Sequence, residues 1–182
     1  MTSQAVQDYH RLLESEPGLL EESRAYLLDR FREVRLVFGG RTLSPYLRPH
    51  FVTDEEWRRI SDVCGTIWGA IETVGRVAPS DALMFEQLGF TDGERDLIAI
   101  DPGYPNVSVT SRLDSFLTPE TYHFVELNAE CPAGIAYADV ASEIFLDLPV
   151  MRRFRQSHDV KPMFCRQHLL NALLTIYSTV RG

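Results

Sequence analysis

The fold is decided at Val107–Asn128, which reads VSVTSRLDSFLTPETYHFVELN. Residues 107–114 and 122–128 alternate between apolar and polar side chains, which is the period-two pattern typical of strands. The segment 117–121 between them contains a proline and turn-forming threonines, so the pattern predicts an antiparallel hairpin. If the turn is centred on Glu120, the numbers of directly opposed residues sum to 240.

Four polar side chains meet on one face of this predicted hairpin. The register places Asp114 opposite Glu126 and Arg112 opposite Asn128, with Cβ atoms about 5 Å apart. Facing carboxylates repel, and a hard cation relieves the conflict because Mg²⁺ takes carboxylate, amide and phosphate oxygens. Asp114, Glu126 and Asn128 are therefore the predicted metal ligands, and Arg112 is placed to bind a phosphate. The alternative is a solvated polar face whose charges only keep the hairpin soluble.

Outside the hairpin, the sequence predicts mostly helices. A capping-box pattern at 53–56 opens a helix to about Val77, and Ser80 is expected to cap a shorter helix that Gly89 ends. The apolar run 97–101 is interpreted as a short strand. Further helices are expected over 4–15, 18–37, 139–146, from Pro149 onward and over 162–180, with 41–52 as a loop. The predicted fold class is α+β, with a helical N-terminal half, a small, mostly antiparallel sheet holding the 107–128 hairpin, and a helical C-terminal end.

Length and composition indicate a folded globular chain. The 182 residues are 45% hydrophobic and 24% charged, which is ordinary for globular proteins. We expect a single domain, with 1–52 as a helical lead-in and 53–182 as a core that contains the hairpin. The net charge of −8 argues against nucleic-acid binding, because nucleic-acid binders usually need a basic face.

Cysteine and targeting patterns favour a cytoplasmic protein. Cys64, Cys131 and Cys165 are far apart and form no C-x-x-C pair, which argues against a disulfide framework or a cysteine zinc site. The N-terminal residues do not follow the signal-peptide pattern, and no apolar run approaches the roughly 18 residues of a membrane span. We therefore expect a location in the cytoplasm and no membrane partner.

The hairpin residues also carry a resemblance to a known family. Ser111–Asp114 reads SRLD, and Phe124–Pro132 reads FVELNAECP. These segments resemble the R-x-D and E-x-N-A-D-x-P motifs of the circularly permuted ATP-grasp proteins, the glutathionylspermidine synthetase-like family. The resemblance is specific but short, since it covers about residues 111–139.

This resemblance implies a role for each matching residue. Asp114, Glu126 and Asn128 would bind the Mg²⁺ that accompanies ATP. Arg112 would contact the phosphoryl group in transfer, as a catalytic and ATP-binding residue. The residues expected to bind substrate are Glu130, which stands where the family has Asp, together with Ala133 and Gly134 at the start of the next helix.

The chain departs from the family pattern in two respects. The segment 133–138, AGIAYA, differs from the stretch that helps to hold glutathione in the synthetase, which argues against glutathione as the substrate. The chain has one lysine, Lys161, and no G-x-x-x-x-G-K-[ST] loop, whereas ATP-grasp enzymes use lysines on the nucleotide phosphates.

The resemblance therefore implies the N-terminal, substrate- and Mg²⁺-binding portion of an ATP-dependent carboxylate–amine ligase. In such an enzyme ATP phosphorylates a small-molecule carboxylate, and an amine then displaces phosphate from the acyl phosphate. The nucleotide-binding lobe is missing from the sequence, so we expect a truncated ligase that is inactive alone, with that lobe supplied in cis or in trans. The alternative is a non-catalytic small-molecule-binding or protein-interaction module that keeps the hairpin without binding ATP.

Overall fold

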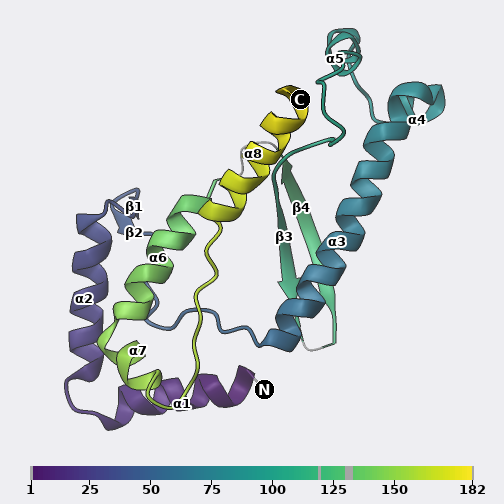
Figure 1. Cartoon of the computed structure of the whole chain (residues 1–182). Helices are drawn as coiled ribbons and strands as arrows, with labels where there is room; N and C mark the ends of the chain where they lie inside the picture. Colours follow the sequence, from purple (N-terminus) through teal and green to yellow (C-terminus); the bar gives the residue numbers. More distant parts are fainter. Residues whose placement is uncertain (1, 119, 130–132, 182) are drawn as a thin grey trace. The chain divides into compact units, whose positions relative to one another are not determined.

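Helices dominate the computed structural model, which describes residues 2–118, 120–129 and 133–181 (Figure 1). The elements are α1 (Thr2–Ser15), α2 (Leu19–Glu33), β1 (Val37–Phe38), β2 (Arg41–Thr42), α3 (Asp54–Val77), the 3-10 helix η1 (Ala78–Ser80), α4 (Ala82–Gln87), α5 (Asp92–Ile98), β3 (Ser111–Leu117), β4 (Tyr122–Ala129), α6 (Ile135–Asp147), α7 (Pro149–Phe154) and α8 (Arg166–Arg181). The four strands form two antiparallel pairs, β1–β2 and β3–β4. The α+β class with helical ends is thus confirmed.

The chain divides into two compact units. Unit 1 comprises residues 1–57 and 134–168, and unit 2 comprises residues 58–133 and 169–182. The predicted site on β3 and β4 lies in unit 2. Within the described ranges, no helix has both the length and the apolar character that crossing a bilayer requires.

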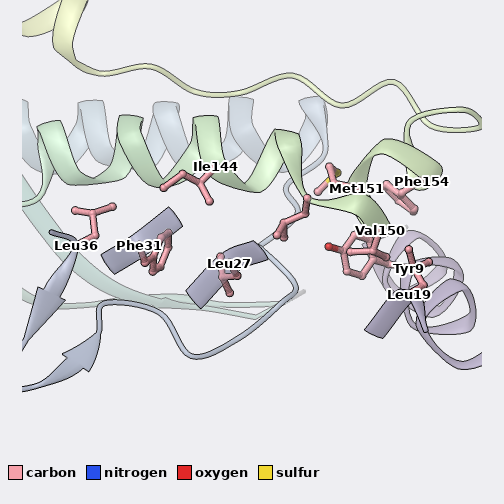
Figure 2. Packing of buried hydrophobic residues seen from close by; sticks show 10 residues of the cluster. Tyr9, Leu19, Leu27, Phe31, Leu36, Ile144, Val150, Met151 and Phe154 are labelled. Carbon is pink, nitrogen blue, oxygen red and sulfur yellow. The ribbon is translucent and has the colours of Figure 1, made fainter. Parts of the chain in front are cut away.

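Unit 1 is organised around an apolar core that α1, α2, α6 and α7 share (Figure 2). Tyr9, Phe31 and Phe154 are almost completely buried there. The ring of Phe154 stacks on Phe51 at 5.1 Å and meets Tyr9 edge-on at 5.3 Å between centroids. Burial raises the pKa of Tyr9, and its hydroxyl donates to the carbonyl of Leu47 at 2.9 Å. The aromatic cluster therefore also fixes the loop that follows β2.

The second helix ends earlier than the expected range of 18–37. It closes at Glu33 in a Schellman motif, in which the N–H of Leu36 donates to the carbonyl of Phe31 at 2.8 Å. Arg35 occupies the left-handed position with φ of 60°. Leu36 and Phe31 are both buried, so the core contact between them favours this ending over another helical turn. Residues 37–42 then form the small β1–β2 hairpin.

The helix α3 begins at the end of the first segment of unit 1 and continues into unit 2, and its predicted capping box is confirmed. The N–H of Glu56 donates to Oγ1 of Thr53 at 3.1 Å, and the N–H of Thr53 donates back to the Glu56 carboxylate at 2.8 Å. The buried carboxylate of Glu72 accepts from the N–H of Val107 at 3.0 Å. This bond anchors the segment before β3 on the helix.

A second contact ties the hairpin to α3. The hydroxyl of Tyr122 at the start of β4 lies 3.7 Å from Sγ of Cys64 and accepts from Oγ of Ser115 at 3.0 Å. Burial raises the pKa of the Tyr122 phenol, so the group stays protonated near neutral pH. The side chain of Tyr122, on β4, therefore contacts both Ser115 on β3 and Cys64 on α3.

Several sequence predictions for the part of the chain after α3 are wrong. Residues 97–101 form no strand, because α5 extends to Ile98 from a capping box of Thr91 and Glu94. The cap of α4 is Asp81 rather than Ser80, since the Asp81 carboxylate accepts from the N–H of Met84 at 3.0 Å. The strand expected from residue 107 begins at Ser111. The helices predicted from 139 and 162 begin at Ile135 and Arg166.

Candidate functional site

The β3–β4 hairpin brings the four predicted site residues onto one face. Asp114 pairs with Glu126, and Arg112 pairs with Asn128. Side chains two residues apart on a strand point to the same side, so both pairs share that side. The register predicted from the sequence is confirmed at these positions.

A β-bulge next to this face makes the register possible. At the turn, Leu117 faces Tyr122, and continuing that register would place Asp114 opposite Val125. Instead the pairing shifts by one residue beyond Asp114, so Val125 is left over and Asp114 faces Glu126. Bulges of this kind bend and twist a strand and are over-represented beside active sites. Here the bulge is what sets the two carboxylates opposite each other.

Arg112 holds Asp114 and the loop after β4 together. Its Nε donates to Oδ1 of Asp114 at 2.7 Å, and Nη2 donates to Oδ2 at 3.3 Å. The remaining terminal nitrogen, Nη1, donates to the backbone carbonyl of Ala133 at 2.8 Å. These three hydrogen bonds orient the guanidinium towards Asp114 and towards the loop after β4.

Glu126 has a neutral partner on its own strand. Nδ2 of Asn128 donates to Oε1 of Glu126 at 2.8 Å. This bond orients the carboxylate and leaves its second oxygen, Oε2, outside the contact. It also turns the amide nitrogen of Asn128, and not its oxygen, towards Glu126. Both side chains thus keep oxygens that can coordinate a cation.

The electrostatics of the face are those of an open, slightly acidic surface. The hydrogen bond to Asp114 raises the pKa of Arg112, and the negative charges of Asp114 and Glu126 add to this effect. The side chains of Arg112 and Asp114 are 44% and 39% exposed. Water therefore screens their ion pair, which contributes little to stability. The pair can rearrange around a ligand at small cost.

The donor chemistry of this face fits a hard cation such as Mg²⁺ or Mn²⁺ better than a softer metal such as Zn²⁺ or Cu²⁺. Asp114, Glu126 and Asn128 supply only oxygens, which hard cations prefer. In the part of the chain that the structure describes, no group of three or more His, Cys, Asp or Glu side chains is arranged to hold a metal ion. The hairpin offers two carboxylates and one amide. One or two carboxylates are what Mg²⁺ usually takes from a protein, with water and phosphate completing its shell.

The predicted substrate residues are placed unequally. The carbonyl of Ala133 is bound by Arg112, as described above. Gly134 is the N-cap of α6 with φ of 118°, and no side chain caps that helix terminus. It belongs to unit 1, whereas Ala133 belongs to unit 2. Glu130 lies outside the described residues.

The sequence analysis did not single out Asp139, a buried carboxylate in α6. Its side chain is 1% exposed. Oδ1 accepts from the N–H of Cys165 at 2.7 Å, and Oδ2 accepts from the N–H and Nε of Arg166, both at 3.0 Å. Burial raises the pKa of Asp139, but these hydrogen bonds and the Arg166 charge outweigh burial, so the pKa falls below its usual value. Asp139 therefore caps the N-terminus of α8 as an ionised carboxylate.

A buried serine makes a similar long-range cap. Oγ of Ser23, on α2, accepts from the N–H of Val150 in the first turn of α7 at 3.1 Å. No short-range sequence signal marks either cap, because the partners are 26 to 127 residues apart. A carboxylate between apolar neighbours, as Asp139 is in YADVA, is the one available hint.

Comparisons with protein-family models, with curated proteins and with solved structures found no match. The geometry of the hairpin face and the motif resemblance over residues 111–139 are therefore the features that bear on function.

Proposed function

We propose that this chain is the substrate- and Mg²⁺-binding portion of an ATP-dependent carboxylate–amine ligase that acts through an acyl phosphate. The observation that carries the proposal is the register of the hairpin, which sets Asp114 opposite Glu126 with Arg112 and Asn128 on the same face. The motif resemblance supplies the reaction class. A small-molecule carboxylate would attack the terminal phosphoryl group of ATP and release ADP. An amine would then attack the acyl carbon and release phosphate.

The residues of the hairpin have distinct roles in this proposal. Asp114, Glu126 and Asn128 would hold Mg²⁺, which when bound neutralises charge on phosphate oxygens. Arg112 would exchange its contact with Asp114 for a bidentate contact with the phosphoryl group. Ala133 holds the guanidinium in place through its carbonyl, so Arg112 keeps one anchor during that exchange.

A complete reaction needs a further nucleotide-binding lobe. The hairpin face is open to solvent, whereas phosphoryl transfer requires positioned phosphates and a site that excludes water. The single lysine and the missing phosphate-binding loop also leave the phosphates of ATP without their usual partners. We propose that this lobe is supplied in cis or in trans, that the chain is inactive without it, and that the protein works in the cytoplasm.

One observation favours the second candidate, a non-catalytic binding or interaction module. Arg112 already neutralises Asp114 through two hydrogen bonds, so that carboxylate has a partner without any cation. On this hypothesis the four residues form a polar hairpin face. The two candidates then differ in whether Glu126 is needed to bind a divalent cation.

Titration calorimetry with Mn²⁺ or Mg²⁺, with and without ATP, distinguishes these candidates. The proposal expects millimolar or tighter metal binding by the wild-type chain, tightening when ATP is present. Glu126→Gln removes one of the two carboxylates and should weaken metal binding about tenfold or more. Glu120→Gln is the matched control, because this exposed carboxylate lies in the hairpin turn near Thr118. It should leave metal binding unchanged.

Two results would contradict the ligase proposal. The first is a wild-type chain that binds neither Mn²⁺ nor Mg²⁺ with or without ATP. The second is equal binding by wild type, Glu126→Gln and Glu120→Gln, since the metal would then lie elsewhere. The non-catalytic module would gain support from the first result.

A further inference from the structure

Three polar side chains of unit 1 form a connected row beside the end of α7. Oγ of Ser157 lies 3.0 Å from Nδ1 of His158, and Nε2 of His158 lies 3.4 Å from Oδ2 of Asp8. Asp8 comes from α1, so the packing of α1 against α7 within unit 1 brings the carboxylate to the other two groups. A hydroxyl, an imidazole and a carboxylate in this order are the groups that activate a serine as a nucleophile.

The turn after α7 and one buried ring hold the imidazole in place. The N–H groups of Ser157 and His158 both donate to the carbonyl of Phe154, at 3.2 and 3.1 Å. The imidazole stacks on the ring of Phe154, with centroids 3.9 Å apart and planes 10° apart. Phe154 is itself buried in the core of unit 1. Stacking fixes the plane of the imidazole and leaves its two nitrogens, at the edge of the ring, for hydrogen bonds.

Asp8 is oriented by two other side chains of α1. Its Oδ1 accepts from Nε2 of Gln4 at 2.9 Å and lies 3.3 Å from Nη1 of Arg11. Both contacts use the same oxygen, and Oδ2 faces the imidazole. A carboxylate beside Nε2 favours the neutral tautomer that carries its proton on that nitrogen. The lone pair of Nδ1 is then directed to the hydroxyl of Ser157.

The hydroxyl of Ser157 has two acceptors within reach. Nδ1 of His158 lies at 3.0 Å, and the carbonyl of Phe154 lies at 3.3 Å. The contact with the imidazole is the shorter one. Ser157 is an exposed residue, whereas the side chains of His158 and Asp8 are only 28% and 25% exposed. The serine oxygen is therefore accessible to a substrate, while the groups behind it are partly shielded from water.

A surface hollow of about 370 Å³ lies against this row of residues. Ser157 and His158 line it together with Arg155, Gln156, Asp159 and Val160. The side chains of Arg155 and Gln156 are N–H donors, which are the groups that stabilise negative charge on the oxygen of an attacked carbonyl. The volume is in the range of small-molecule sites. The hollow thus has room for a small carbonyl compound next to the serine oxygen.

We propose that Ser157 and His158 are the catalytic residues of an esterase site for small carboxylic esters. Oγ of Ser157 forms a bond to the ester carbonyl carbon, and its proton passes to Nδ1 of His158. The bond from that carbon to the alkoxy oxygen breaks, and the alcohol leaves with the proton from His158. Water then attacks the acyl carbon and gives a proton to His158, which returns it to Oγ as the carboxylic acid leaves.

Asp8 is a positioning residue in this site, because it acts on the substrate only through the imidazole. The activity is separate from the hairpin face and does not depend on the proposed ligase function. Its test is therefore independent of metal binding by Glu126.

Hydrolysis of p-nitrophenyl acetate by the full chain, followed by the release of p-nitrophenolate, tests the proposal. Ser157→Ala removes the nucleophile, and His158→Gln removes the base. Each should lower kcat/KM by about 100-fold or more. His10→Gln is the matched control, because His10 is an exposed histidine on α1 and exposed imidazoles cleave this ester slowly by themselves. This control should keep the wild-type rate.

A fluorophosphonate probe gives a readout that does not depend on turnover. Oγ of Ser157 should form a bond to phosphorus with loss of fluoride, and peptide mass spectrometry should locate the adduct on Ser157. The wild type and His10→Gln should be labelled, whereas His158→Gln should not. Asp8→Asn should lower kcat about tenfold or more with KM unchanged, since Asp8 does not line the hollow. Circular dichroism checks that each variant keeps its helices.

Two outcomes overturn the proposal. The first is a wild-type chain in which the probe does not label Ser157. The second is hydrolysis that Ser157→Ala leaves unchanged, since another group would then cleave the ester. Ser157→Ala removes one hydroxyl from an exposed residue, so we expect it to fold. Loss of hydrolysis in folded Ser157→Ala, with His10→Gln still active and Ser157 labelled in the wild type, supports the proposal.

Discussion

Replacing Asp139 by Asn removes a buried charge that organises the first turn of α8. The carboxylate accepts three hydrogen bonds, one from Cys165 and two from Arg166. An Asn oxygen in the position of Oδ2 can keep the two bonds from Arg166, but each becomes weaker because the acceptor no longer carries a charge. The amide nitrogen would then face the N–H of Cys165, which loses its acceptor. One unpaired N–H and two weakened bonds give an expected loss of about 2–4 kcal/mol in the free energy of unfolding.

The pH dependence of this loss identifies its cause. The folded-state pKa of Asp139 is lowered, so its stabilisation is present above the unfolded-state value of about 3.9. It disappears as the pH falls through the folded-state pKa. The gap between wild type and Asp139→Asn should therefore be full at neutral pH and should shrink below about pH 4.

Urea denaturation followed by circular dichroism at a series of pH values measures this gap. Glu143→Gln is the control, because Glu143 accepts from the same arginine at 2.6 Å but is 53% exposed. Solvent screens that pair, so the control should unfold like the wild type. The reasoning is refuted if Glu143→Gln destabilises as much as Asp139→Asn. It is also refuted if the gap is below about 1 kcal/mol at neutral pH or does not change on acidification.

Two further predictions concern packing within the units. Ser23→Ala should lower the free energy of unfolding by about 1–3 kcal/mol, because it leaves the N–H of Val150 without its buried acceptor; an unchanged denaturation midpoint would contradict this. Gly69→Ala should stabilise α3 by about 0.5–1 kcal/mol, since nothing lies within 4 Å of the added methyl group. Gly75→Ala should show no such gain, because its Cβ would lie 2.7 Å from both methyl groups of Val107. Thermal unfolding of the two glycine variants compares them directly, and an equal gain in both would contradict the packing assignment.

The hairpin could be predicted from the sequence because its signals are local. Alternation predicts two strands, although the first begins at Ser111 rather than at residue 107, and a turn centred on Glu120 gives the pairing of Asp114 with Glu126. The turn is in fact centred half a residue earlier, since Leu117 faces Tyr122. The bulge compensates for that difference at the site. The sequence therefore predicts the pairing of the site residues correctly, but it predicts neither the true centre of the turn nor the bulge.

The errors arose where a short apolar run or a distant partner decided the structure. Residues 97–101 are apolar enough for a strand, but length and periodicity cannot separate a short strand from a helix end. The capping box at Thr91 and Glu94 was the readable signal for α5. No comparable signal exists for the start of α8, because Asp139 caps it from 26 residues away. Non-local hydrogen bonds of this kind leave almost no trace in sequence spacing.

The two functional hypotheses differ over one carboxylate. Arg112 neutralises Asp114, so a polar hairpin needs nothing more at that position. Glu126 faces Asp114 across the strands and has a neutral amide as its hydrogen-bond partner. A lysine at position 126 would keep the hairpin equally soluble, and it would also remove the repulsion between the carboxylates of Asp114 and Glu126. A second carboxylate opposite the first, with an amide oxygen beside it, is a costly arrangement for a surface and a useful one for a divalent cation. This is why Glu126, rather than Asp114 or Arg112, is the residue on which the proposed function is tested.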